Sequence, residues 1–420
     1  MGQKTKKNKI GKKILVGLSL IGPGLFLMGY NIGTGSITTM GMAGARYGMT
    51  LLWTVVLSGI FTYILMVSFG KLTLVTGKTA LFNIKNGIWG GKYFALYIMI
   101  ALIIGELLAL IGIMGIVAEL IQEAFRLFSP DKSLFVSTGY IISAITVLLF
   151  FALWFGKYKV FERILTVLVV IIALCFIAVF FLVAPSYTTI LKGMVPGIPD
   201  SPNAYMMVAA MVGTTCSAAV FIIRSTVVLE KGWTIRNLKN ERKDSLVSAF
   251  MMVFLSAIIM AVAAGTLHVM GLTLENTVEM TRLLGPLGGD AATFLLILGI
   301  TGAGLSTIFP IVLIAPWLIA DYTGKPRDIK SPLFRVLIVG GLLFAFGSIF
   351  IDHPPPILMV LSQAFQATIL PLVAIPIFFL LNNKRLMGAA KMPSTGWNLC
   401  LMSVILFALI TTYYAIIGFL

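Results

Sequence analysis

Apolar stretches of about 20 residues or more follow one another along almost the whole chain. A helix needs about 20 predominantly apolar residues to cross the hydrocarbon core of a bilayer. Hydrophobic residues make up 59% and charged residues only 11% of the sequence, which excludes a water-soluble globular domain. An outer-membrane barrel would instead show short segments of alternating polarity. The chain is therefore predicted to be an all-α polytopic membrane protein.

The formal net charge of +16 indicates membrane topology and does not predict nucleic-acid binding. Lys and Arg gather in short segments between the apolar stretches, as the positive-inside rule describes. These segments are residues 1–13, 71–92, 156–163, 231–243, 321–335 and 382–391. All fall on one side of the membrane when the apolar stretches are counted as eleven spans. We therefore predict a multi-pass protein of the inner (plasma) membrane, with a cytoplasmic N-terminus and an extracytoplasmic C-terminus.

The eleven predicted spans are separated by loops that are basic on one side and poor in basic residues on the other. They cover about 22–47, 49–70, 94–122, 135–155, 162–184, 204–229, 245–271, 291–319, 334–351, 356–382 and 397–419. The three cysteines all lie in apolar segments and form no disulfide or metal-ligand pattern.

Two clusters of small and hydroxyl residues interrupt the first and the sixth span. They are residues 29–36 (GYNIGTGS) and 212–217 (VGTTCS). Glycine costs about 1 kcal/mol relative to alanine inside a helix, so both spans are predicted to be broken. Half-helices that meet near the bilayer midplane form the substrate site of many secondary transporters. The repeat predicts a basic tail (1–13), two inverted five-helix repeats (14–185 and 204–382) and an eleventh helix (396–420).

Several motifs make the chain resemble the NRAMP (natural resistance-associated macrophage protein) family of metal transporters. Residues 22–24 (GPG) and 41–52 (GMAGARYGMTLL) are similar to the family's first span. Residues 105–107 and 111–112 are similar to its third span, and residues 362–376 and 386–388 to its tenth span and following loop. The resemblance runs from about residue 20 to 390. It implies a leucine-transporter-like (APC-type) fold and transport of divalent transition metals together with protons.

The residues that bind the metal in that family are replaced in this chain. Where the family reads Asp-Pro-Gly-Asn, this sequence has Gly33, Thr34, Gly35 and Ser36. Where the family reads Met-Pro-His, it has Ser217, Ala218 and Ala219. In the third span, Glu106 stands for an aspartate and Ala109 for a glutamate. Transition metals favour carboxylate, imidazole or thioether ligands, so no site of the transition-metal type is expected at the breaks.

The altered breaks favour a small anion as substrate. A helix N-terminus carries about half a positive charge and unpaired N–H groups, and the hydroxyls nearby are further donors. The predicted substrate-binding residues are Gly33, Thr34, Gly35, Ser36, Gly213, Thr214, Thr215, Cys216 and Ser217. Bicarbonate is the leading candidate. The alternatives are an NRAMP-like carrier of Mg²⁺ or Mn²⁺, a transport-inactive receptor or scaffold, and small residues that serve helix packing alone.

Uptake of an anion against a negative-inside potential would need a driving cation, since the field opposes it by about 2.3 kcal/mol per charge per 100 mV. Na⁺ or H⁺ is expected. Ser306 and Thr307 resemble the hydroxyl pair that leucine-transporter-like carriers use for sodium, which the backbone carbonyls of Tyr30 and Gly33 would complete. An interhelical hydrogen bond is the alternative for the pair. No other cofactor and no obligatory protein partner are expected, and the chain is predicted to be monomeric.

Glu106 is a carboxylate deep in an apolar stretch, and an intramembrane acid is a functional hypothesis by default. In the family the matching residue belongs to a proton pathway with an arginine of the ninth span, so we predict a Glu106–Arg335 pair that bridges or gates. Arg224 would attract an anion into the inner vestibule or anchor the helix end. Gln363 and Gln366 would line the path or bond neighbouring helices.

Neither of the two histidines is expected to take part in transport. His268 is expected to be a core residue and His353 to lie in an external loop. The sequence contains no set of residues typical of an intramembrane enzyme. We therefore expect transport rather than catalysis.

Overall fold

A computed structural model describes residues 33–128, 136–154, 158–183, 185–201, 203–325, 327–328, 330–351, 355–388 and 392–420. The predicted tail 1–13, the first half of the first span with Tyr30, and His353 lie outside the described residues.

The described part of the chain consists of helices and their connections. The helices before the second break are α3 (Thr34–Tyr47), α4 (Leu52–Thr76), α5 (Ala80–Gly87), α6 (Gly91–Phe128), α7 (Thr138–Trp154), α8 (Tyr158–Val183), α9 (Tyr187–Gly193) and α10 (Ala204–Thr215). After it come α11 (Ala218–Glu230), η1 (Ile235–Asn237), α12 (Leu238–Ala263), η2 (Ala264–His268), α13 (Thr277–Met280), η3 (Thr281–Leu287) and α14 (Gly289–Thr323). The last are α15 (Pro332–Phe344), α16 (Gly347–Phe350), α17 (Pro355–Leu381), α18 (Lys384–Met387) and α19 (Thr395–Phe419).

Each predicted span from the second onward coincides with one helix or with two consecutive helices. Among the described residues, eight stretches are long and apolar enough to cross a bilayer. The shorter α7 has 17 residues, and α3 is the described half of the first span.

The sixth span is broken where the sequence predicts it. The helix α10 ends at Thr215 and α11 begins at Ala218, so Cys216 and Ser217 are not helical. Ser217 has extended backbone angles, with φ −67° and ψ 129°. The described part of the first span begins in the same way, because Gly33 is extended (φ −101°, ψ −166°) and α3 starts directly after it.

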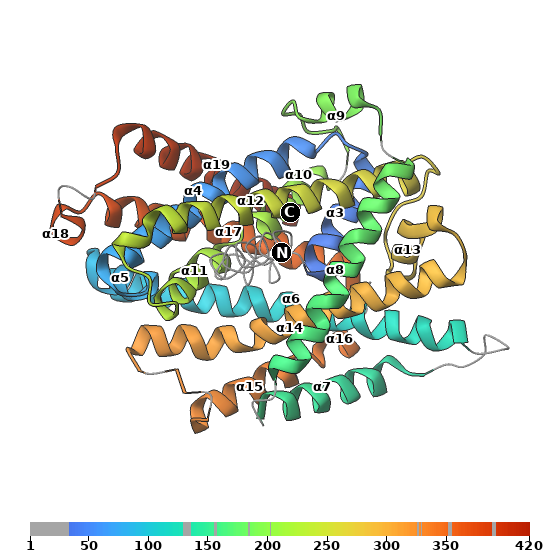
Figure 1. The fold of residues 1–420 in the computed structure, drawn as a ribbon, viewed down its shortest axis with the longest axis horizontal. Helices are drawn as coiled ribbons and strands as arrows, with labels where there is room; N and C mark the ends of the chain where they lie inside the picture. Colours follow the sequence, from blue (N-terminus) through green and yellow to red (C-terminus); the bar gives the residue numbers. More distant parts are fainter. Residues whose placement is uncertain are drawn as a thin grey trace, which may run out of the picture.

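Three long helices, α6, α14 and α17, form the centre of the molecule, and α10 packs against α17 (Figure 1). The helices α7 and α15 lie along one edge, and α4 and α19 along the opposite one (Figure 1). The α10–α17 contact is a close backbone approach, because any Cβ at Gly213 would overlap the carbonyl oxygen of Gln363. Gly213, predicted to bind substrate, therefore brings α10 up to α17.

Candidate functional site

A small cavity lies where the two broken spans meet α6, α14 and α17. Its volume is about 30 Å³, which is room for about two or three water molecules at 10–15 Å³ each. The described residues that line it are Gly33, Gly35, Glu106, Ala109, Ile113, Thr214, Ser217, Thr307, Ile311, Met359, Gln363 and Gln366. The site is thus assembled from five parts of the chain that are distant in sequence.

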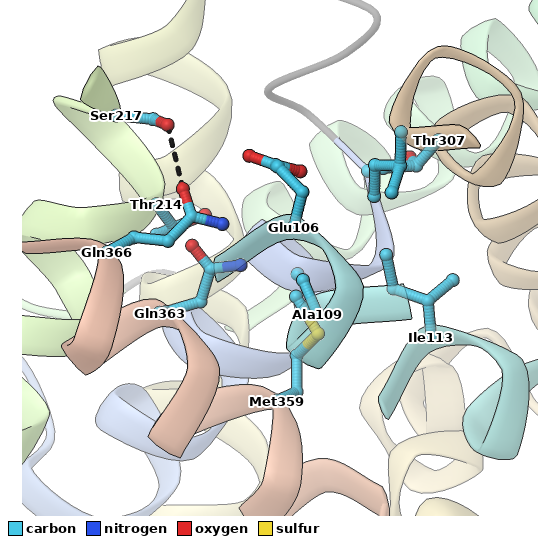
Figure 2. A pocket seen from close by; sticks show the side chains of 12 residues that line it. Glu106, Ala109, Ile113, Thr214, Ser217, Thr307, Met359, Gln363 and Gln366 are labelled. Carbon is cyan, nitrogen blue, oxygen red and sulfur yellow. Dashed lines mark hydrogen bonds between the residues drawn. The ribbon is translucent and has the colours of Figure 1, made fainter. Parts of the chain in front are cut away.

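The described lining of the cavity includes the Glu106 carboxylate and several neutral oxygen donors. Figure 2 shows the Glu106 side chain reaching from α6 into the space between Gln366 and Thr307. Glu106 is 3% exposed, and Gln363 and Gln366 of α17 are buried as well. The Ser217 hydroxyl donates to the Oε1 atom of Gln366 at 2.9 Å, so α17 holds the break in the sixth span.

Four of the nine residues predicted to bind substrate line the cavity: Gly33, Gly35, Thr214 and Ser217. Ser36 is buried behind them, where its hydroxyl forms a hydrogen bond with the Thr214 hydroxyl at 3.0 Å.

The other four of the nine have packing roles around the cavity. The Thr34 hydroxyl donates to the Ile300 carbonyl of α14 at 3.4 Å. The Thr215 carbonyl accepts a hydrogen bond from the Thr62 hydroxyl of α4 at 2.9 Å. Cys216 is fully buried, and Gly213 packs against Gln363.

The predicted pair between Glu106 and Arg335 is wrong, because the two side chains lie in different places. The Arg335 guanidinium lies over the Trp154 ring, 4.0 Å from its centroid. It lines a separate small cavity between α7 and α15, whereas Glu106 lines the central one. The indole face carries partial negative charge and offers Arg335 a cation–π contact. The sequence pattern did not predict this contact.

Arg224 neither faces a vestibule nor anchors a helix end at the surface. It is fully buried and donates to both carboxylate oxygens of Glu241, at 3.1 and 2.8 Å. A second ion pair joins it to Asp244 at 2.6 Å. Both roles predicted for Arg224 are therefore wrong, because its charge is neutralised by α12.

The two hydroxyl residues predicted for the coupling-ion site, Ser306 and Thr307 of α14, have different surroundings. Ser306 and Thr307 both donate to the carbonyl of Ala303, each at 2.8 Å. Thr307 also lines the cavity beside Gly33, whereas Ser306 is not among the residues described as lining it. Tyr30, the fourth residue of the predicted coupling-ion site, lies outside the described residues.

Met359 lines the cavity although the sequence analysis did not single it out. Its spacing of four residues from Gln363 places both on one face of α17, which is the signal that identifies it. His268 was expected in the core but is exposed at the end of η2. Its Nδ1 atom forms a hydrogen bond with the Ala45 carbonyl at 2.9 Å.

Within the described parts of the chain, no three His, Cys, Asp or Glu side chains come together as a metal centre. The cavity instead combines the Glu106 carboxylate with amide, hydroxyl and thioether groups. Carboxylates and neutral oxygens are ligands for hard cations.

Comparison with known sequences shows long matches to one group of transporters. A protein named Divalent metal cation transporter MntH from Pectobacterium carotovorum is 26% identical over 378 residues, which cover 89% of this chain and 88% of the relative. A protein of the same name from Nostoc sp. is 25% identical over 409 residues, covering 92% and 89%.

Solved structures show the same fold. The manganese transporter of Eremococcus coleocola superposes with a TM-score of 0.73 at 14% identity, covering 95% of this chain and 86% of that one. Mhp1, a nucleobase-cation-symport-1 family transporter, gives a TM-score of 0.63 at 15% identity, covering 94% and 92%. The fold is the predicted leucine-transporter-like, all-α polytopic one.

The prediction of a small-anion carrier for bicarbonate, coupled to Na⁺ or H⁺, is wrong in its substrate. The curated relatives are named as divalent metal cation transporters. The anion prediction considered the two breaks alone, whereas Glu106 of α6 brings a carboxylate into the cavity beside them. Residues 24–418 match the profile of one protein family. The chain belongs to the natural resistance-associated macrophage protein-like (Nramp) family.

Proposed function

We propose that this protein is a secondary transporter that carries a divalent cation across the plasma membrane through the central cavity. The cation that suits the site best is a hard, partly hydrated one, with Mg²⁺ as the first candidate. The observation that carries the proposal is the buried Glu106 carboxylate, which faces oxygen donors from three other helices.

The donor set supports Mg²⁺ over a soft transition metal. Mg²⁺ takes oxygen ligands, is commonly bound through one or two carboxylates, and keeps several of its waters. Glu106 supplies one carboxylate, and Gln363, Gln366, Thr214 and Ser217 supply neutral oxygens. Mn²⁺ is the second candidate, because it accepts the same carboxylate and carbonyl oxygens as Mg²⁺. Met359 contributes the sulfur atom among the described lining residues.

Helix ends of both signs meet at the cavity. The helix α10 ends at Thr215, next to the lining residue Thr214. A helix C-terminus carries about half a negative charge and favours a nearby cation. The helices α3 and α11 begin beside the lining residues Gly33 and Ser217, with ends of the opposite sign. The feature that favours a cation at the breaks is therefore the Glu106 carboxylate and not the helix ends. The small cavity, with room for about two or three waters, requires a hydrated ion to lose part of its shell.

The membrane potential favours the proposed direction of transport. A negative-inside potential assists an entering divalent cation by about 4.6 kcal/mol per 100 mV, at about 2.3 kcal/mol for each charge. The basic loops support an orientation with the N-terminus in the cytoplasm. Alternating access would come from movement of the two five-helix repeats, 14–185 and 204–382, around the site.

The test is uptake into liposomes that contain the purified protein, under an imposed negative-inside potential. Mg²⁺ and Mn²⁺ entry are followed separately with trapped fluorescent indicators, and protein-free liposomes serve as the control. We expect saturable Mg²⁺ uptake. Uptake of Mn²⁺ without Mg²⁺ would replace the first candidate with the second, and uptake of neither cation would overturn the proposed function.

A further inference from the structure

We propose that the Thr307 hydroxyl is a ligand of the transported cation, and that position 33 is a glycine because Thr307 occupies its side-chain space. This inference rests on the proposed function and names a residue of α14 that contributes to the substrate site. Thr307 is 6% exposed and lines the cavity together with Glu106 and the two glutamines.

Backbone conformation does not explain Gly33. Its φ of −101° and ψ of −166° are extended, and residues with side chains adopt such angles freely. The reason is steric. A Cβ at position 33 would overlap the Thr307 Oγ1 atom and would lie 3.0 Å from its Cβ and 3.1 Å from its Cγ2. Rotation about χ1 would exchange one overlap for another, and a β-branched side chain in a helix has few rotamers.

The next glycine of the first span repeats the arrangement. A Cβ at Gly35 would contact Met359 and would lie 3.1 Å from the Nε2 atom of Gln363. Both glycines line the cavity. At both positions, therefore, polar or sulfur-bearing side chains of neighbouring helices occupy the space that a side chain of the first span would take. The side-chain donors described at this site therefore come from α6, α10, α14, α17 and Ser217 rather than from α3.

The hydrogen bonding of Thr307 leaves its oxygen available to a cation. Its Oγ1 atom donates to the Ala303 carbonyl at 2.8 Å, which uses the hydroxyl proton inside the helix. A hydroxyl has two acceptor lone pairs, and hard cations bind such oxygens. Ser306 makes the same bond to Ala303 at 2.8 Å without being described as a cavity-lining residue, so it is a matched control.

The first arm of the test measures Mg²⁺ uptake in liposomes by Thr307→Val, Thr307→Ser and Ser306→Ala. Thr307→Val keeps the shape and removes the oxygen, and we expect at least a tenfold lower uptake rate at subsaturating Mg²⁺. Thr307→Ser restores the oxygen and is expected to retain at least a third of the wild-type rate. Ser306→Ala is expected to stay within twofold of wild type.

The second arm measures thermal unfolding in detergent and needs no transport. We expect Gly33→Ala to lower the midpoint by several degrees, and Gly33→Ala with Thr307→Ala to recover most of that loss. Gly33→Ala as stable as the wild type would overturn the steric half of the inference.

Failure of the inference can be separated from failure of the proposed function. If the wild type transports Mg²⁺ and Thr307→Val transports it equally well, Thr307 is not a ligand and the proposed function stands. If the wild type transports neither Mg²⁺ nor Mn²⁺, the proposed function fails and the ligand role of Thr307 fails with it.

Discussion

The hydroxyl groups of Ser36 and Thr214 lie 3.0 Å apart and form a buried hydrogen bond between residues separated by 178 positions. Ser36 belongs to α3, the described half of the first broken span, and Thr214 to α10, the first half of the sixth. The bond therefore joins the two interrupted spans directly beside the cavity. A polar contact between two membrane helices at this point ties the geometry of one break to that of the other.

The Ser36–Thr214 bond predicts measurable coupling between the two positions. A typical intramolecular hydrogen bond contributes about 0.5–1.5 kcal/mol. Ser36→Ala and Thr214→Val should each lower the free energy of unfolding, and the double variant should lose less than the sum of the two by about that amount. A double-mutant cycle on unfolding in detergent measures it. Strictly additive effects would show that the bond contributes no net stability.

Replacing Gly213 by alanine is expected to lower the stability of the protein strongly, through packing alone and with no change in charge. A Cβ at this position would overlap the backbone carbonyl of Gln363, and backbone cannot move aside as a flexible side chain can. Gly213→Ala should destabilise the protein by about 1–3 kcal/mol or more. Gly340 of α15 is the matched control, because a Cβ there meets nothing within 4 Å.

The comparison between the two glycine variants is made by thermal unfolding in detergent. Gly340→Ala should be neutral or should stabilise the helix by up to about 1 kcal/mol, since alanine has the higher helix propensity. Equal midpoints for Gly213→Ala and Gly340→Ala would contradict the close approach of α10 to α17.

Arg224 belongs to a buried charge cluster, so its replacement should lower the free energy of unfolding by more than the loss of an exposed ion pair does. Arg224 and Glu241 have fully buried side chains, and Asp244 is 1% exposed. Removing the guanidinium leaves buried carboxylates without their partner, which costs about 3–5 kcal/mol. Arg224→Met should therefore yield little folded protein.

A second variant keeps the prediction for Arg224 testable when the first does not fold. Arg224→Met combined with Glu241→Gln and Asp244→Asn removes the charges together and should recover a large part of the stability. Arg327 provides the contrast, because its partner Glu230 is 59% exposed, and exposed pairs contribute about 0–1 kcal/mol. Glu230→Ala should change the unfolding free energy by no more than that. A stable, fully expressed Arg224→Met protein would contradict the buried cluster.

The helices and the second break could be predicted from the sequence because both have strong local signals. Apolar length determines where a helix can cross a bilayer, and the cluster VGTTCS marks the interruption between Thr215 and Ala218. Gly33, Gly35, Thr214 and Ser217 were likewise placed at the site by their position in the breaks.

The partners of the charged residues could not be predicted in the same way. Arg335 was paired with Glu106 on the resemblance alone, but its guanidinium lies over Trp154 from another helix. Arg224 was assigned to a vestibule, although its partners Glu241 and Asp244 lie on the next helix, in a segment that reads as a basic loop. Such pairings depend on how helices rotate about their axes. The anion prediction failed for the same reason, because it considered the breaks without the carboxylate that α6 brings to them.

The central claim is that the buried Glu106 carboxylate binds the divalent cation in the cavity. Mg²⁺ uptake into liposomes that contain the Glu106→Gln variant tests this claim most directly. Glutamine keeps the shape and removes the charge. Glu123→Gln is the control on the same helix, since Glu123 pairs with Arg126 at 3.1 Å and is not among the residues described as lining the cavity. We predict at least a tenfold lower rate for Glu106→Gln, equivalent to about 1.4 kcal/mol, and a rate near wild type for Glu123→Gln. Wild-type uptake by Glu106→Gln would contradict the role of Glu106 in cation binding.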